Sequence, residues 1–339
     1  MLPYQVIDAG SFTSDATLMK QVKLSDRPDL FWLRNRTAWG DDAAETSVES
    51  WWRYGMAADA AQTVDQAVTT GILSSEAVTS GGFIFIDTAN PPVYAALATT
   101  AITGSAGTYV VSMADTGSIN VGDWVRLYGT TGELQLAGYP FQVTAVTTNV
   151  SVTLGYMATG GLTLAADATA GSVLKYIPNL MYPRHAWIAN ITQAAQAVVY
   201  FTGKNDFTPG EVVSFSVPSS EYDMIEINNK RARVLSVTNS ATESSITIDL
   251  DTTGYTAFDF PTSAEAAAGV SPAVCVPSSS SVVPLNGSAT NPQVPVGTNL
   301  LDSFDNRNKY VMQLGSNVIT SASAVYDWVA FKADRFQAE

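Results

Sequence analysis

The sequence is poor in the residues on which most catalytic and metal sites depend. It contains one cysteine, Cys275, and one histidine, His185, in 339 residues. A single cysteine excludes an intrachain disulfide and a thiolate metal cluster, and we expect it to pack as a small hydrophobe. A single histidine leaves general acid–base chemistry without its usual donor, and no nucleophile motif surrounds any serine or cysteine. We therefore interpret His185 as a linker or packing residue.

Positive charge is also scarce. The chain has 17 Lys and Arg against 31 Asp and Glu, a net charge of −14. Between Arg53 and Lys175 the one basic residue is Arg126, so this stretch cannot neutralise the phosphates of a nucleic acid. The densest basic stretch is NKRAR, where strand alternation places Arg231 and Arg233 on one solvated face. The sequence therefore predicts no nucleic-acid partner.

Long apolar runs and catalytic motifs are missing as well. No stretch of about 18 or more apolar residues occurs, and MLPYQVIDAG lacks the basic and apolar regions of a secretory signal, so we expect no membrane insertion. The chain has no P-loop, GxGxxG, GxSxG or HExxH motif. Asp249 and Asp251 lack the glycine and distal glutamate of an EF-hand loop. The sequence predicts no cofactor, no metal and no enzymatic activity.

What the sequence does contain is a repeat. INVGDWVRLYG (119–129) and FTPGEVVSFSV (207–217) share a glycine, an acid and an alternating strand, the pattern of a chain that leaves a tight turn and enters a sheet. Further matches follow in one order, from AIT and NIT to the closing strands VLKYIP and AVCVP. We interpret residues 96–180 and 186–277 as two copies of a small β-barrel or sandwich module, each with about five short strands.

The opening strand of the first copy shows how side chains should alternate. We interpret Asp123 and its counterpart Glu211 as turn residues without a catalytic partner. In DWVRLYG, the period of two places Trp124, Arg126 and Tyr128 on one face of the strand. We expect Trp124 to be half-buried packing rather than a ligand platform.

Residues outside the modules predict a third β-structure. Residues 1–95 and 300–339 contain strand-like runs such as DLFWLRNRT and AVYDWVAFKAD. We expect these segments to pair into one β-sandwich base, which makes the fold all-β with the modules inserted between the two halves of the base. Residues 278–299, rich in Ser and Pro, are predicted to be an extended arm or linker. Ala-rich spacing in residues 56–80 predicts the one sizeable helix.

Aromatic residues provide two sets of candidate sites. In the base, a tryptophan cluster is a candidate core or subunit interface, with the core favoured by the burial habits of aromatics. Its members are Trp32, Trp39, Trp51, Trp52 and Trp328. In the modules, four tyrosines are candidates for stacking on host-surface glycans: Tyr128, Tyr139, Tyr156 and Tyr255.

The repeated pattern resembles a β-module of tailed-bacteriophage virion proteins, often labelled as similar to the first catalytic-cysteine half-domain of ubiquitin-activating enzymes. The resemblance covers residues 98–178 and 187–277 and rests on I-T, V-V, G-D/E-x-V and G-Y in that order. GSFTS, WWRYGM and LGSNVITSASAVYDWVAFKAD are similar to the flanking parts of such proteins. Because no adenylation domain accompanies the repeat, the resemblance implies a structural role in a virion and carries no ubiquitin chemistry.

We therefore expect a non-enzymatic virion structural protein, synthesised in the host bacterial cytoplasm. Its partners would be copies of itself and other virion proteins, held through sheet edges and aromatic patches. Projecting repeats favour a tail component. The alternatives are a capsid decoration protein and a host-surface carbohydrate-binding adhesin. A β-fold depolymerase also stays open, because a paired-carboxylate glycosidase needs only two of the 31 acids.

Overall fold

The computed structural model shows a chain built almost entirely of β-strands. It describes residues 4–14, 20–39, 46–66, 72–87, 94–105, 108–117, 119–131, 140–155, 170–176, 185–217, 222–228, 230–240, 243–259, 273–278 and 310–333. These residues contain one helix, the short 3-10 helix η3 (Ile225–Ile227). The chain divides into two compact units, Met1–Pro91 with Asp305–Glu339, which we call the base, and Pro92–Phe304, which contains both modules. The predicted all-β fold class is confirmed.

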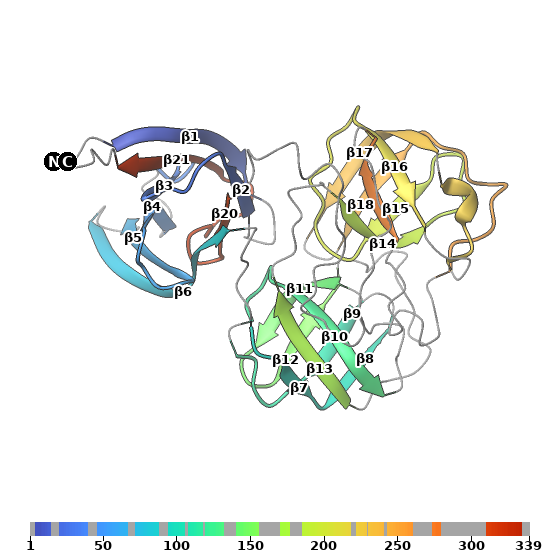
Figure 1. Ribbon diagram of the computed structural model, residues 1–339, viewed down its shortest axis with the longest axis horizontal. Coiled ribbons are helices and arrows are strands. Elements are labelled where there is room, and N and C mark those ends of the chain that lie inside the picture. The colour runs from blue at the N-terminus through green and yellow to red at the C-terminus, as the bar shows by residue number, and fades with distance from the viewer. Residues whose placement is uncertain are drawn as a thin grey trace, which may run out of the picture. The chain divides into compact units, whose positions relative to one another are not determined.

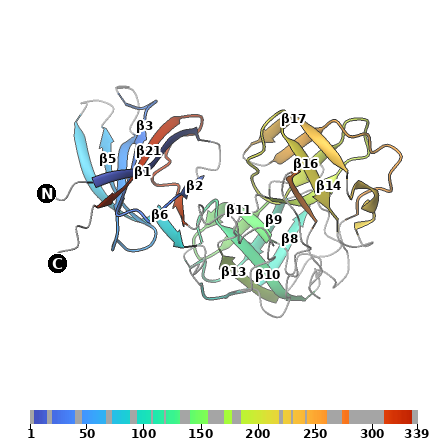
Figure 2. The same cartoon turned by 45° about the horizontal axis from the view of Figure 1, so that its top comes forward.

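The base is one eight-stranded antiparallel sheet made from both end segments of the chain. In spatial order its strands are β1 (Tyr4–Thr13), β21 (Val325–Ala333), β3 (Leu30–Asn35), β4 (Thr46–Arg53), β5 (Ala60–Gln66), β6 (Leu73–Asp87), β20 (Tyr310–Leu314) and β2 (Lys20–Leu24). β21 lies beside β1 along its length (Figure 1, Figure 2). The predicted pairing of the two end segments is confirmed.

This single sheet curls around one core, so the predicted sandwich base is built from one continuous sheet. Inward side chains from all eight strands join one hydrophobic cluster. The two sheet edges meet where the backbone N–H of Ser25, directly after β2, donates to Asp8 Oδ2 in β1 at 2.5 Å. β6 supplies a bend at Gly82, where a side-chain Cβ would lie 2.6 Å from the carbonyl carbon of Ala60. Only glycine allows the two backbones to approach so closely.

Residues 56–80, where the sequence predicts a helix, contribute to strands β5 and β6, which pair antiparallel. The side chains of β5 alternate, with Ala61 and Thr63 buried and Gln62 half-buried between them. The helix prediction was wrong because alanine fills a small inward position on a strand as readily as a helical one. Pairing with β4 and β6 then overrides the weak local preference.

The two modules have the same strand order. Module 1 consists of β8 (Ala101–Ser105), β9 (Thr108–Ser112), β12 (Ser151–Leu154), β11 (Pro140–Thr147), β10 (Trp124–Thr131), β13 (Ala170–Tyr176) and β7 (Leu97–Thr99). Module 2 is a closed barrel of β14 (Ala186–Ile191), β15 (Val198–Phe201), β18 (Ser244–Ile248), β17 (Arg231–Asn239), β16 (Val212–Ser216) and β19 (Val274–Pro277).

One strand distinguishes the two barrels. In module 2, β14 pairs with both β15 and β19 and so closes the ring. In module 1 that place is divided between β8, which pairs with β9, and β7, which pairs with β13. Each module therefore has at least six strands, one more than the repeat predicts, because the sequence does not show where a strand is interrupted.

The glycines of the two repeated turns have the same geometry. Gly122 has φ 91° and Gly210 has φ 90°, in the left-handed region that glycine occupies without penalty. The N–H of Gly122 donates to Val143 O and that of Gly210 to Val234 O, each at 2.8 Å. The repeat seen in the sequence is therefore a repeat of backbone structure.

The acids of the two turns also match. Asp123 Oδ2 accepts the backbone N–H of Asn120 at 2.7 Å, and Glu211 Oε2 accepts that of Thr208 at 3.2 Å. In return, the N–H of Asp123 donates to Asn120 O and that of Glu211 donates to Thr208 O, each at 3.1 Å. The interpretation of Asp123 and Glu211 as turn residues is confirmed.

The closing strands of the modules align differently from the sequence match. Val173 in β13 lies opposite Leu127, and Cys275 in β19 lies opposite Phe215. Cys275 therefore corresponds to Val173, so matching VLKYIP and AVCVP by their final prolines puts them out of register. Cys275 is 0% exposed, which confirms that it packs as a small hydrophobe.

The predicted alternation of side chains is clear in module 2. In β17, Arg231 and Arg233 are exposed on one face while Ala232 is buried between them. In β10 of module 1, Trp124 and Arg126 are buried like Val125 and Leu127, so burial does not distinguish the two faces of that strand. The neighbouring candidate arm, residues 278–299, lies outside the described residues apart from its first residue.

Candidate functional site

The five candidate tryptophans of the base lie in three environments. Trp52 is buried in the core, and Trp328 packs against that core from β21. Trp39 is 47% exposed. Trp32 and Trp51 are half-buried. Core and surface positions are therefore held by different members of the cluster.

The period of two along β3 explains why one face of this sheet remains aromatic. Phe31 and Leu33 point into the core, while Leu30, Trp32 and Arg34 are only half-buried on the opposite, outer face. β4 alternates in the same way, with Trp52 inside and Trp51 outside. The outer face thus carries large side chains that the base itself does not cover.

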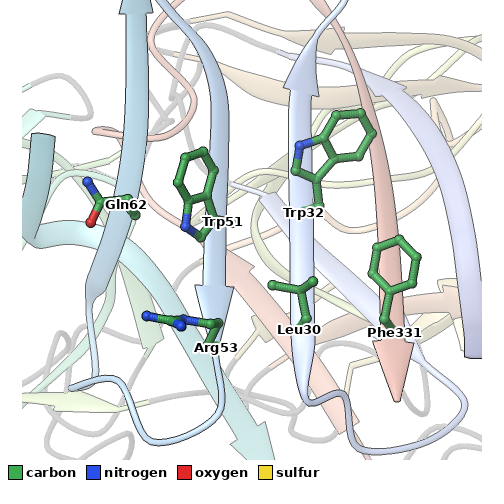
Figure 3. Close-up of a pocket in the computed structure, with 6 residues that line it drawn as sticks. All are labelled: Leu30, Trp32, Trp51, Arg53, Gln62 and Phe331. Carbon is green, nitrogen blue, oxygen red and sulfur yellow. The ribbon is translucent and has the colours of Figure 1, made fainter. Parts of the chain in front are cut away.

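Strand register gathers these outer side chains into a groove. Trp32 lies directly opposite Trp51, and Leu30 lies opposite Arg53. The groove has a volume of about 720 Å³ and is lined by Leu30, Trp32, Trp51, Arg53, Gln62 and Phe331. Figure 3 shows Trp51 and Arg53 along β4 beside Trp32 and Leu30 along β3. Because they are paired across neighbouring strands about 4.8 Å apart, the two indoles stand on the same outer face, each over its own strand.

Two polar side chains complete the groove. The amide Nε2 of Gln62 donates to Ser75 Oγ at 2.8 Å and to Glu76 O at 2.9 Å, which fixes the amide and leaves its carbonyl oxygen to accept. Arg53 is exposed, and among the described residues its guanidinium has no ion pair or hydrogen bond. The groove therefore combines apolar rings with one amide and one available cation.

Two other arginines of the base lie over aromatic rings. The guanidinium of Arg34 lies 3.6 Å from the ring centroid of Trp39, and that of Arg27 lies 3.7 Å from the ring centroid of Tyr54. Such cation–π contacts hold exposed aromatics in place. Trp39 is therefore an exposed tryptophan outside the groove, with its own partner.

The end of β21 that carries Phe331 is fixed by two aspartates. Lys332 Nζ donates to Asp26 Oδ2, and the backbone N–H of Ala333 donates to Asp29 Oδ2 at 2.9 Å. The hydrogen bond from Lys332 lowers the pKa of Asp26 below its usual range. These contacts position one wall of the groove.

The structure brings none of the four candidate tyrosines into this groove. Tyr255 is half-buried and packs against the core of the modules, with its carbonyl oxygen 2.6 Å from Gln193 Nε2. Tyr128 lies in β10, where its backbone alone is described. Tyr139 and Tyr156 lie outside the described residues. Their role in glycan binding stays a prediction.

Sequence reasoning missed a buried ion pair in module 1. Lys175 Nζ lies 2.8 Å from Asp123 Oδ2, and their side chains are only 4% and 5% exposed. The Lys175 ammonium also lies 4.8 Å from the ring centroid of Tyr94. Arg126 and Lys175, the basic residues of module 1, are both buried. Their scarcity in an apolar, acidic stretch is the signal that could have pointed to an internal role.

Module 2 covers Trp124, which explains why this residue is only 3% exposed and not half-buried as expected. The rings of Trp124 and Trp187 lie 4.9 Å apart at their centroids. At Gly203, a Cβ would lie 2.2 Å from the Trp124 ring. Gln142 Oε1 accepts the backbone N–H of Lys204 at 2.8 Å. The two modules therefore share a tightly packed junction.

Residues that the sequence offers for chemistry have structural neighbours instead. The ring of His185 lies edge-on to Trp187, with centroids 4.8 Å apart, in agreement with a packing role. Asp249 Oδ1 accepts the backbone N–H of Arg233 at 2.6 Å. Within the described ranges, no group of three His, Cys, Asp or Glu side chains is placed to hold a metal ion.

No protein-family model matches the chain, and neither a curated protein nor a solved structure matches it. In the part of the chain that the structure describes, no helix has the length and apolar character needed to span a bilayer. Among the described residues, the aromatic groove of the base is the candidate site that the geometry defines.

Proposed function

We propose that the chain is a non-enzymatic structural protein of a tailed-bacteriophage virion, which acts by associating with itself and docking to other virion proteins. The duplicated module is the observation that carries this proposal. Two copies with one strand order and one turn geometry are joined through a packed junction. They are inserted in a base built from both ends of the chain. Repetition of a rigid unit on a base suits a scaffold.

The environment of the reactive side chains supports a non-enzymatic role. Nucleophilic catalysis needs an accessible thiol or hydroxyl beside a base. The Cys275 thiol is fully buried in β19, and the ring of the sole histidine packs against Trp187. Both side chains contribute to packing in the module unit.

Within the virion we propose a place in the tail. Two copies of one module in a single chain suit the exterior of a tail, where repeated modules extend the reach of the particle. A capsid decoration protein is the alternative, and it would use the same modules on the head surface. The partners in either case are copies of this chain and other virion proteins.

The mass and symmetry of the native assembly test this function. Native mass spectrometry and negative-stain microscopy of the full chain, over rising concentration, should show a closed oligomer with cyclic symmetry. Gold-labelled antibody on purified particles should then mark the tail. Label on the head would replace the tail assignment with the decoration alternative. A chain that stays monomeric and is absent from particles would overturn the proposal.

A further inference from the structure

The size of the base groove fits a small ligand better than a protein. Its volume of about 720 Å³ lies in the range of small-molecule sites, roughly 300–1,000 Å³. A stable protein interface buries about 800 Å² on each partner and involves about 20–30 residues a side. Six of the described residues line the groove, which is far fewer. The groove is therefore matched to an occupant of a few rings.

The shape of the groove selects a ligand with one apolar face. Trp32 and Trp51 are half-buried on the outer face of the sheet, so a molecule lying on them keeps its other side in water. A wholly apolar ligand would gain little from such a one-sided site. A pyranose ring has an apolar C–H face and a rim of hydroxyl groups, and so matches an indole below and water above.

The charge of the groove selects among saccharides. Of the described residues that line it, Arg53 carries the charge and none is an acid. Other cations of this face have partners, as Arg34 lies over Trp39 and Arg36 lies 3.5 Å from Asp327. A guanidinium pairs best with a planar carboxylate through two parallel hydrogen bonds. A single cation is too little for a nucleic acid, which needs several.

We propose that the groove binds a carboxylate-bearing saccharide. One sugar ring stacks on the Trp51 indole, its carboxylate pairs with the Arg53 guanidinium two residues along β4, and a hydroxyl donates to Oε1 of Gln62, which is paired with Trp51. Leu30 and Phe331 extend the apolar floor beside Trp32. This binding site is distinct from the tyrosines of the modules. It also goes beyond the assembly role, because a scaffold need not bind sugar.

The first test is a glycan array with the full chain. Saccharides ending in a uronic acid or a sialic acid are printed beside neutral counterparts of the same linkage. Binding should concentrate on the carboxylated members. The strongest ligand and its methyl ester are then titrated in solution by tryptophan fluorescence, and the ester should bind about tenfold more weakly because the charge is lost. Absence of binding, or equal binding of acid and ester, overturns the proposal.

Matched variants locate the site. Trp51→Ala should weaken binding of both acid and ester by about tenfold or more, because the stacking surface is lost. Arg53→Gln should weaken the acid alone, to the level of the ester. Trp39→Ala and Arg36→Gln, which alter an exposed tryptophan and a surface arginine outside the groove, should leave both affinities unchanged. Equal losses in the control variants would also overturn the assignment.

A final measurement separates this proposal from self-association. Light scattering of Trp51→Ala and the parent chain should give the same mass, since the groove holds a sugar. A change in mass, with glycan binding intact, would make the groove an interface between copies and overturn the saccharide site. Failure of sugar binding leaves the proposed virion role standing, because that role is tested by particle location.

Discussion

Module 1 and module 2 have the same turn but use its acid differently. In module 1, Asp123 is buried and pairs with Lys175. In module 2, Glu211 is half-buried in the equivalent turn. Lys175 lies opposite Val125, and the module 2 residue at that register position is Pro277, which carries no charge. The repeat therefore preserves backbone geometry while the energetic role of a side chain diverges.

The outer faces of the opening strands, β10 in module 1 and β16 in module 2, also differ, and the strand in module 1 is again the more buried. Trp124 at the start of β10 is 3% exposed because module 2 covers it, whereas Val212 at the start of β16 is 37% exposed. The strands are equivalent by their glycine turns. The junction is thus asymmetric: one copy offers this face to its neighbour and the other leaves it open.

Removal of the buried charge should produce the largest difference in stability between the two modules. Asp123→Asn leaves the Lys175 ammonium buried without its anion, and should destabilise module 1 by about 3–5 kcal/mol. Glu211→Gln, its counterpart, should change stability by less than about 0.5 kcal/mol. Hydrogen exchange followed by mass spectrometry reports both modules in the full chain. If the two variants lost hydrogen-exchange protection to the same extent, the two acids would contribute equally to stability and the prediction would be wrong.

Filling the junction should have the next largest effect. Gly203→Ala places a Cβ 2.2 Å from the Trp124 ring, and should cost about 1–3 kcal/mol by overpacking and shift tryptophan emission. Gly254→Ala is the control, because nothing lies within 4 Å of its Cβ position. Thermal unfolding and fluorescence measure both. Equal unfolding temperatures and equal tryptophan emission in the two variants would contradict a tightly packed junction.

Substituting the turn glycines tests the equivalence itself. Gly210→Ala has open space around the new Cβ, so its cost of about 1 kcal/mol should come from the left-handed φ of 90° alone. Gly122→Ala, with φ 91°, should cost at least as much. Urea unfolding of each variant provides the values. A neutral Gly210→Ala would show that the turn does not require glycine.

Lowering the pH should produce the smallest and most local change in the structure. The N–H and hydroxyl of Thr253 donate to Asp251 Oδ1 at 2.9 and 2.7 Å and lower the pKa of Asp251 below its usual 3.8. Because the folded pKa is the lower one, this stabilisation is present above pH 3.8 and lost as pH falls through the folded pKa. The Thr253 amide signal in NMR should move only below pH 3.8, and Asp251→Asn should abolish that movement.

Patterns of local chemistry predicted much of this fold. A glycine before an acid needs only a few neighbouring residues to define its turn, so Gly122 and Gly210 identified both modules. Pairing between segments far apart in the sequence was harder to predict. The helix expected over 56–80 became strands because β4 and β6 pair with β5, and pairing partners are not visible in alanine-rich spacing.

The candidate site shows the same limit. The tryptophan cluster was visible in the sequence, but its division into core and groove depends on register. A shift of one residue along β4 would exchange Trp51 and Trp52 between the two faces of the sheet. The Asp123–Lys175 pair likewise joins residues that only the pairing of β10 with β13 brings together.

The place of β21 in the sheet links the folding of the base to protein synthesis. β21 lies between β1 and β3, yet both modules are translated before it. On a growing chain the modules can fold first, while β1 and β3 wait with unpaired edges that invite aggregation. Only a chain synthesised through β21 covers those edges. A product truncated after module 2 would therefore keep the edges of β1 and β3 that face β21 exposed.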